Sequence, residues 1–181
     1  MEKFRISLTG DLGSGKSTVM GILSSRHQVE RVSAGSIQRE MAKSKGMTIE
    51  EFNRFMETDP SFDKKLDDYL HSYEQKQGNY IFDSRLAWHF VPSTLSFYLA
   101  VKPEVAAERI YKAGREDEGY SSAEEALEKL TARRQSEVLR YKTYYGLDIL
   151  NMDNYDCVID TTNRTPEEVA RLIEAEVKCH K

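Results

Sequence analysis

The sequence has few cysteines, no long hydrophobic run and no excess of positive charge. Its two cysteines, Cys157 and Cys179, are too few for a disulfide framework and do not have metal-ligand spacing. No apolar stretch approaches transmembrane length, and the chain enters an apolar strand pattern at once, without a secretory signal. The formal net charge of -4 argues against a general attraction to nucleic acid or to an anionic membrane. We therefore expect a cytoplasmic protein with neither partner.

The pattern along the 181 residues alternates strand-like and helical segments, and the length suits a single domain over residues 1–181. Strands are expected at 4–9, 30–33, 80–83, 95–101 and 156–160, and helices at 16–25, 37–45, 103–112 and 123–145. Such alternation predicts parallel strands with helices on both faces. We expect a three-layer α/β/α fold around a five-stranded parallel sheet.

Three further helix starts are expected from local signals. Residues 48–51, Thr-Ile-Glu-Glu, and residues 165–168, Thr-Pro-Glu-Glu, both fit a capping box, in which a threonine and a glutamate three residues later satisfy each other's backbone N–H groups. Pro60, after Asp59, suits the first position of a helix. Either Ser121 or Ser122 is expected to cap the long helix that begins near residue 123.

A glycine-rich motif follows the first expected strand. Residues 10–17, Gly-Asp-Leu-Gly-Ser-Gly-Lys-Ser, fit G-x-x-x-x-G-K-[ST] between a strand and a helix, the context of a phosphate loop. Its backbone N–H groups and the helix N-terminus favour phosphate, Lys16 is expected on the β- and γ-phosphates, and Ser17 is expected on Mg²⁺. The fold is thus expected to be of the P-loop NTPase type and to bind a nucleoside triphosphate. The residues expected to contact that ligand are Gly10, Asp11, Gly13, Ser14, Gly15, Lys16, Ser17 and Thr18.

An acid and several arginines complete the candidate site. Asp83 ends an apolar strand and is expected to reach the magnesium ion through water. Arg85 lies two residues further on, at the carboxyl end of an expected central strand, where doubly wound sheets bind ligands. Arg39 lies on the helix that follows the second strand. Phosphoryl transfer requires positioning and positive charge more than covalent help, so these arginines are candidates for the site.

A polar, glycine-bearing segment at 113–122 precedes the longest expected helix, with Arg109 before it and Arg115 inside it. On that helix, steps of four, three and four place one set of side chains on a common face: Arg133, Glu137, Arg140 and Tyr144. A solvated face with Glu–Arg pairs is the simpler interpretation. Beside a phosphate loop, a cationic face that closes over bound phosphates is the better one, because water must be excluded from the transfer site. We therefore expect a helical lid over about 113–140.

Together these motifs resemble a small nucleoside monophosphate kinase, specifically a short cytidylate kinase of the archaeal-like type. The resemblance covers essentially the whole chain. Besides the phosphate loop, it is carried by residues 33–39 (SAGSIQR), 83–88 (DSRLAW), 133–142, 144–148 (YYGLD) and 154–156 (NYD). It implies transfer of a phosphoryl group from ATP, with Mg²⁺, to CMP or dCMP, giving ADP and CDP or dCDP. We expect a monomer.

The resemblance also implies a role for each matching position. Helices over about 34–77 would bind the acceptor. Arg39 and Arg85 would grip its phosphate, while Arg133 and Arg140 would span that phosphate and the transferring group. The expected catalytic residues are Lys16, Arg85, Arg133 and Arg140, and Arg109 is expected at ATP. Glu137 matches an acid that reads the cytosine amino group, and a carboxylate there would disfavour uracil, which offers an acceptor instead.

Two positions depart from the family pattern, and two other functions remain open. Ser84 stands where many relatives carry glycine. Ala34 stands where larger bacterial enzymes place a base-contacting serine, which leaves Ser33 and Ser36 as alternatives for that contact. One alternative keeps the same chemistry with another acceptor, either another nucleotide or a small alcohol such as dephospho-coenzyme A. A regulatory module without catalysis is the remaining alternative, although it has no need of the intact lysine and arginine set.

Overall fold

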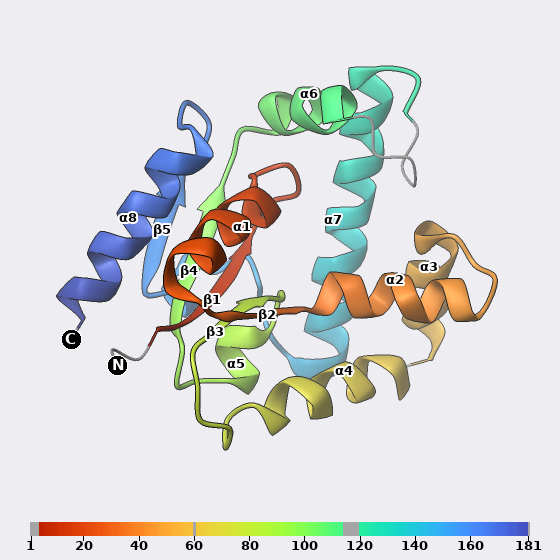
Figure 1. Cartoon of the computed structure of the whole chain (residues 1–181). Helices are drawn as coiled ribbons and strands as arrows, with labels where there is room; N and C mark the ends of the chain where they lie inside the picture. The colour runs from red at the N-terminus through yellow and green to blue at the C-terminus, as the bar shows by residue number, and fades with distance from the viewer. Residues whose placement is uncertain (1–3, 60, 114–119, 181) are drawn as a thin grey trace.

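A computed structural model describes residues 4–59, 61–113 and 120–180 of the chain. Five parallel strands form one sheet in the order β2-β3-β1-β4-β5 (Figure 1). They are β1 (Arg5–Gly10), β2 (Glu30–Ser33), β3 (Tyr80–Asp83), β4 (Leu95–Ala100) and β5 (Cys157–Asp160). The predicted five-stranded parallel sheet is confirmed, and the central position of β1 brings the phosphate loop to the middle of its carboxyl edge.

Helices cover both faces of the sheet. They are α1 (Lys16–His27), α2 (Ala34–Ser44), α3 (Ile49–Thr58), α4 (Ser61–Ser72), α5 (Ala87–Phe90), α6 (Pro103–Ala113), α7 (Ala123–Tyr145) and α8 (Pro166–Cys179). In Figure 1, α1 and α8 lie against one face, whereas α2, α3 and α4 form a group that projects from the sheet toward α7.

Strand side chains alternate between two apolar cores. Ile6 and Leu8 of β1 pack with α1 and α8 in the core of one face. On the opposite face, Phe82 of β3 packs with residues of α4 and α5. A neighbouring cluster joins Leu86 to Tyr141 of α7. Burial on both faces explains the largely apolar sequences of β3 and β4, and the helices on the two faces give the three layers.

The capping signals predict helix starts well. Both capping boxes are present, at the beginnings of α3 and α8. Ser122, not Ser121, caps α7 by accepting a hydrogen bond from the backbone N–H of Glu125. Of the expected start at 59–60, Asp59 ends α3 as its C-cap, and Pro60 lies outside the described residues.

The helices differ from the sequence-based prediction at two places. Helix α2 begins at Ala34, three residues before the expected start, because Ser33 accepts a hydrogen bond from the backbone N–H of Ser36 and so acts as the N-cap. The four-residue helix α5 was not expected, since it is too short to give a helical period.

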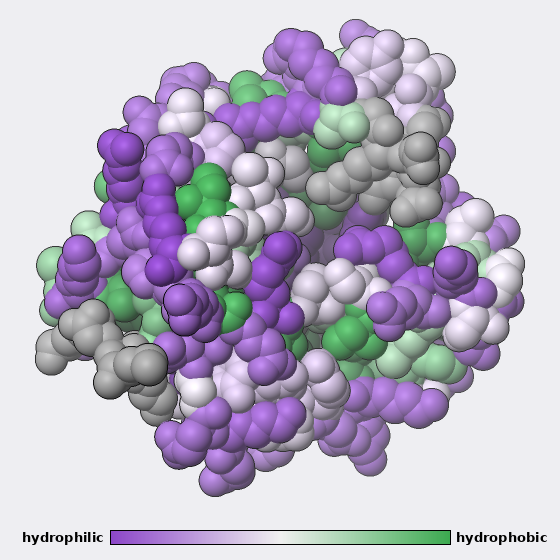
Figure 2. All heavy atoms as spheres, viewed as in Figure 1, coloured by the Kyte–Doolittle hydropathy of each residue, from purple (hydrophilic) through white to green (hydrophobic). Residues whose placement is uncertain are grey.

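The surface and the lid segment complete the description of the fold. Hydrophilic residues predominate on the face shown in Figure 2. Within the described ranges, no helix has the length and apolar character needed to span a membrane. Of the expected lid at 113–140, residues 114–119, which include Arg115, lie outside the described residues; the remainder is formed by the end of α6 and by α7.

Candidate active site

The phosphate loop packs closely against strand β4 and helix α6. Gly10 has a φ of 139°, and a Cβ atom there would lie 2.2 Å from the carbonyl oxygen of Leu99 in β4. Gly13 has a φ of 78° and meets the backbone of Ala106 in α6, where a Cβ atom would lie at 2.8 Å. Both positions therefore require glycine for conformation and for space. The loop is held in shape by these contacts with β4 and α6.

Lys16 is partly buried at the start of α1, and its side chain turns back onto the loop. Its Nζ atom donates hydrogen bonds to the carbonyl oxygens of Asp11 (2.8 Å) and Gly10 (3.1 Å). Burial, and next the positive charge of Arg85, lower the pKa of Lys16 from 10.5 to about 7, and nearby carboxylates such as Asp83 offset this only in part. A buried cationic group beside another cation is stabilised by an anion, so the environment of Lys16 favours bound phosphate.

The carboxylate of Asp11 is bound by groups of β4, of the residue after β4, and of α7. It accepts hydrogen bonds from the Tyr98 hydroxyl (2.6 Å) and from the backbone N–H of Val101 (3.0 Å). Arg134 Nη2 of α7 lies 3.3 Å from the same carboxylate. Gly10, Asp11 and Ser14 are not among the described residues that line the cleft, and their contact with a nucleotide stays a prediction.

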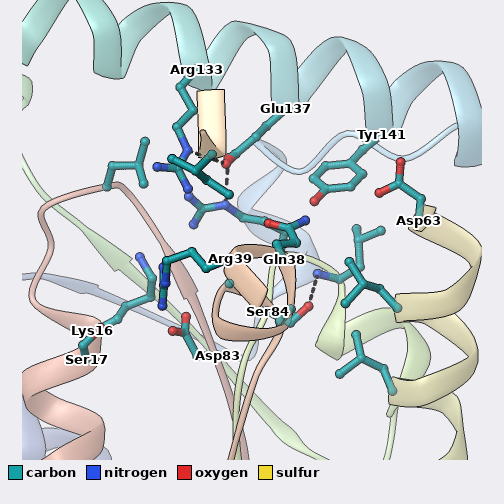
Figure 3. A pocket seen from close by; sticks show the side chains of 18 of the residues that line it. Lys16, Ser17, Gln38, Arg39, Asp63, Asp83, Ser84, Arg133, Glu137 and Tyr141 are labelled. Carbon is teal, nitrogen blue, oxygen red and sulfur yellow. Dashed lines mark hydrogen bonds and ion pairs between the residues drawn. The ribbon is translucent and has the colours of Figure 1, made fainter. Parts of the chain in front are cut away.

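Sheet register brings Asp83 beside the phosphate loop. It is paired with Leu8 of β1 on one side and with Ser33 of β2 on the other. Asp83 lines the cleft together with Lys16 and Ser17 (Figure 3). In the described part of the chain no three or more His, Cys, Asp or Glu side chains cluster as a metal site. A carboxylate and a hydroxyl suit Mg²⁺, which is usually held by one or two protein oxygens together with phosphate and water.

The phosphate loop opens into a cleft of about 480 Å³, which is in the size range of small-molecule sites. In Figure 3, Lys16 and Ser17 lie at one end, Asp63 of α4 and Tyr141 of α7 at the other, and Arg39 and Gln38 between them. The predicted site residues that line the cleft are Gly13, Gly15, Lys16, Ser17, Thr18, Arg39, Asp83, Arg85, Arg133 and Glu137.

Arg85 and Arg133 share a buried carboxylate. Arg85 Nε donates to Glu137 Oε2 at 2.8 Å, and Arg133 Nε lies 3.5 Å from Glu137 Oε1. Burial alone would raise the pKa of Glu137, but the two arginines outweigh it and lower the pKa to about 2. Arg85 also donates to the carbonyl of Gly10. Glu137 therefore stays ionised and orients two cations beside the phosphate loop.

The serines near α2 are occupied elsewhere. Ser33 donates to Asp83 at 3.4 Å, and Ser36 accepts from Arg39 at 3.2 Å. Of the described residues in this segment, Ala34, Gly35, Gln38 and Arg39 line the cleft, whereas neither serine does. Gln38 is thus the polar group on this side that sequence reasoning did not consider.

Arg109 and Arg140 lie outside the described lining of the main cleft. Arg109 donates to the carbonyls of Thr161 (2.8 Å) and Thr162 (3.1 Å) and at 3.5 Å to that of Gly13, so it supports the phosphate loop from behind. Arg140 is directed toward Asp63 of α4, with 3.5 Å between its Nε atom and Asp63 Oδ2. It lines a second, adjoining hollow between α3 and α7.

Sequence reasoning missed the far end of the cleft. Asp63, Leu66, Asp67 and Leu70 of α4 line it together with Tyr141. The signal was available, because two acids lie at i and i+4 on a helix face that also carries buried leucines. Acids are rarely placed on such a face without a partner.

Comparison with known proteins agrees with this geometry. A family model described as an AAA domain matches residues 6–134. A cytidylate kinase from Methanosarcina acetivorans is 37% identical over 160 residues, which cover 87% of each chain. A cytidylate kinase from Sulfolobus acidocaldarius is 39% identical over 171 residues, covering 93% of this chain and 91% of the relative.

A solved structure supports the fold. Shikimate kinase from Acinetobacter baumannii superposes with a TM-score of 0.62 at 16% identity, over 99% of this chain and 96% of that one. At this identity the likeness concerns the fold alone, which is that of a P-loop kinase. With the phosphate loop, the sheet order and the two close relatives taken together, the chain belongs to the cytidylate kinase family.

Proposed function

We propose that this enzyme transfers the γ-phosphoryl group of ATP to CMP or dCMP, giving ADP and CDP or dCDP. One observation carries the proposal. The phosphate loop, the arginines Arg39, Arg85 and Arg133, and a far end with both polar and apolar side chains all line a single cleft. A donor triphosphate and a second phosphate-bearing ligand both find cationic partners there. The relatives named cytidylate kinase support the choice of acceptor.

For the donor half, we propose that residues 10–18 bind the ATP phosphates and that Ser17 and Asp83 hold Mg²⁺. The metal ion would bridge phosphate oxygens and neutralise charge that develops in transfer. Lys16 stabilises the same charge from the loop side. Arg109 acts indirectly, since its contact with Gly13 keeps the loop in place.

For the acceptor half, Arg39 and Arg85 bind the monophosphate, and Arg133 approaches the transferring group from α7. Glu137 holds Arg85 and Arg133 in a common orientation. No general base is assigned, because a phosphate monoester with a second pKa of about 6 is already ionised at neutral pH.

A nucleotide-panel assay tests the proposal. ADP release is measured with ATP, with and without Mg²⁺, against CMP, dCMP, UMP, AMP and dephospho-coenzyme A. We expect Mg²⁺-dependent turnover with CMP or dCMP well above the acceptor-free background. Turnover with dephospho-coenzyme A or AMP alone would identify a kinase of different acceptor, and nucleotide binding without turnover would indicate a regulatory module.

A further inference from the structure

The turn that carries Arg85 is held by two side chains that the proposed function does not use. This turn joins the end of β3 to the short helix α5. The Thr9 hydroxyl donates a hydrogen bond to the carbonyl oxygen of Ser84 at 2.9 Å. The indole Nε1 of Trp88 donates to the carbonyl oxygen of Arg85, also at 2.9 Å. Because each peptide group is planar, the two bonds fix the peptide groups on both sides of the Arg85 Cα atom, and thereby the direction of its side chain.

The guanidinium group fixes the other end of the same side chain. Arg85 Nε donates to Glu137 Oε2 at 2.8 Å, and Nη1 donates to the carbonyl of Gly10. A ligand-binding group has to be held within about 0.5 Å of its productive position by packing and by hydrogen bonds from the residues behind it. In a side chain as long as arginine, a small rotation of the backbone displaces the guanidinium group by a larger amount. The hydrogen bond from Trp88 opposes that rotation.

The indole that makes this bond is itself fixed by packing. Trp88 is partly buried and packs against a cluster that contains Leu86, Tyr141 and Ile149. Its ring also contacts that of Tyr155, with 5.8 Å between the centroids. The Tyr155 hydroxyl donates to the carbonyl of Ile149 at 3.0 Å, which holds the segment between α7 and β5 against the indole. The direction of the N–H group, the single polar group of the side chain, is therefore set by residues distant in sequence.

The place of Trp88 relative to the cleft separates it from the ligand-binding residues. Arg85 and Leu86 line the cleft, whereas Trp88 is not among the described lining residues. A side chain in this position acts on a ligand only through a neighbour. The neighbour that it contacts by a hydrogen bond is Arg85.

We propose that Trp88 is a positioning residue for the acceptor phosphate. Through its hydrogen bond to the Arg85 backbone, it sets the direction from which the guanidinium group meets that phosphate. This inference rests on the proposed function, in which Arg85 binds the acceptor. A purely structural role, in which the indole N–H satisfies itself at a nearby carbonyl, predicts a loss of stability without a change in acceptor affinity. The affinity for the acceptor therefore separates the two interpretations.

The test uses the fact that Trp88 is the only tryptophan of the chain, so an analogue supplied in place of tryptophan replaces this residue alone. In the benzothiophene analogue, a sulfur atom stands where the indole has its N–H group, which removes the donor and keeps the shape of the ring. A ring-fluorinated tryptophan keeps the N–H group and is the matched control. The two proteins and wild type are compared by Tm, by the Kd for CMP and for ATP, and by steady-state kinetics.

We expect the benzothiophene protein to lose about two- to tenfold in affinity for CMP and in kcat/KM for CMP, the effect of one hydrogen bond. The Kd and KM for ATP should stay unchanged, because the phosphate loop keeps its own contacts with β4 and α6. The fluorinated protein should match wild type in every measurement, since the donor to the Arg85 carbonyl is retained.

The outcomes are distinguishable. If wild type phosphorylates CMP and the benzothiophene protein binds and phosphorylates it equally well, the inference is overturned. An equal loss of affinity for CMP and for ATP would indicate a general structural role and would overturn it too. If wild type does not phosphorylate CMP at all, the proposed function itself fails, and the inference with it. Should the benzothiophene protein not fold, W88F, which also lacks the donor, takes its place, and wild-type affinity for CMP in W88F would overturn the inference.

Discussion

Arg134 Nη2 lies 3.3 Å from Asp11 Oδ1, a contact that ties helix α7 to the phosphate loop. The same guanidinium group contacts the Tyr98 hydroxyl, which in turn donates to Asp11. Three elements, α7, β4 and the loop, thus meet at one carboxylate. Because Asp11 O also accepts a hydrogen bond from Lys16, the position of α7 is coupled to the group that we propose contacts ATP.

Removing this contact should loosen the loop. R134M and D11N each delete a charge-assisted interaction, so we expect the free energy of unfolding to fall by about 1–3 kcal/mol and the KM for ATP to rise several-fold. Urea unfolding and steady-state kinetics measure both. R171M, which removes an exposed arginine paired with Glu167, is the matched control and should leave both unchanged. Equal behaviour of R134M and R171M would show that the contact has no such role.

Replacing Lys16 should stabilise the unliganded enzyme while disabling it. Below pH 10.5 the unfolded chain holds a proton on Lys16, whereas the folded protein holds it only below about pH 7. The cost of burying Lys16 is therefore greatest below pH 7 and disappears as pH rises toward 10.5. K16M should raise Tm most at or below pH 7 and lower kcat by about 10²–10³, the typical effect of losing one stabilising donor. A lower Tm in K16M would contradict the assigned environment.

ATP binding should take up a proton. The pKa of Lys16 in the unliganded protein is about 7, and the charge of the triphosphate raises it. At about pH 8, binding should therefore be accompanied by uptake of up to one proton, and affinity should weaken as pH increases. Calorimetry in buffers of different ionisation enthalpy gives the proton count. K16M should remove most of the uptake; an unchanged count would assign it to another group.

Asp67 should make stability fall as pH rises. Burial raises its pKa from 3.8 to about 6, although a hydrogen bond from Tyr145 opposes the shift. Between these values the folded state binds more protons than the unfolded chain, so stability is fully present below pH 3.8 and decreases until about pH 6. D67N should thus be more stable than wild type above pH 6, with the difference vanishing in acid. D68N, on the exposed side of the same helix, should show no such dependence.

The sheet was well predicted from the sequence, and the structure brings the predicted donor-site residues Lys16, Ser17 and Asp83 to one cleft. β3 has the expected bounds. The pairing of Leu8 with Asp83 follows from the strand order and from the phosphate-loop motif, which requires a strand before it and a helix after it. Such features depend on local backbone requirements, which glycines, caps and apolar runs encode directly. The far end of the cleft was harder to predict. The meeting of Asp63 with Arg140 joins residues 77 positions apart, and no local pattern states that α4 and α7 approach each other.

The order of elements within the cleft has a consequence for redesign. The pairing of β1 with β3 fixes the distance between the phosphate loop, with Lys16 and Ser17, and Asp83 at the end of β3. Asp63, in contrast, lies in α4, which is not part of the sheet. Exchanging the segment 34–77 for another helical insert is therefore expected to leave the spacing between the phosphate loop and Asp83, the proposed metal-binding acid, unchanged. The choice of acceptor is in this sense modular, and new acceptors are best sought by rebuilding α2 to α4 around a constant donor half.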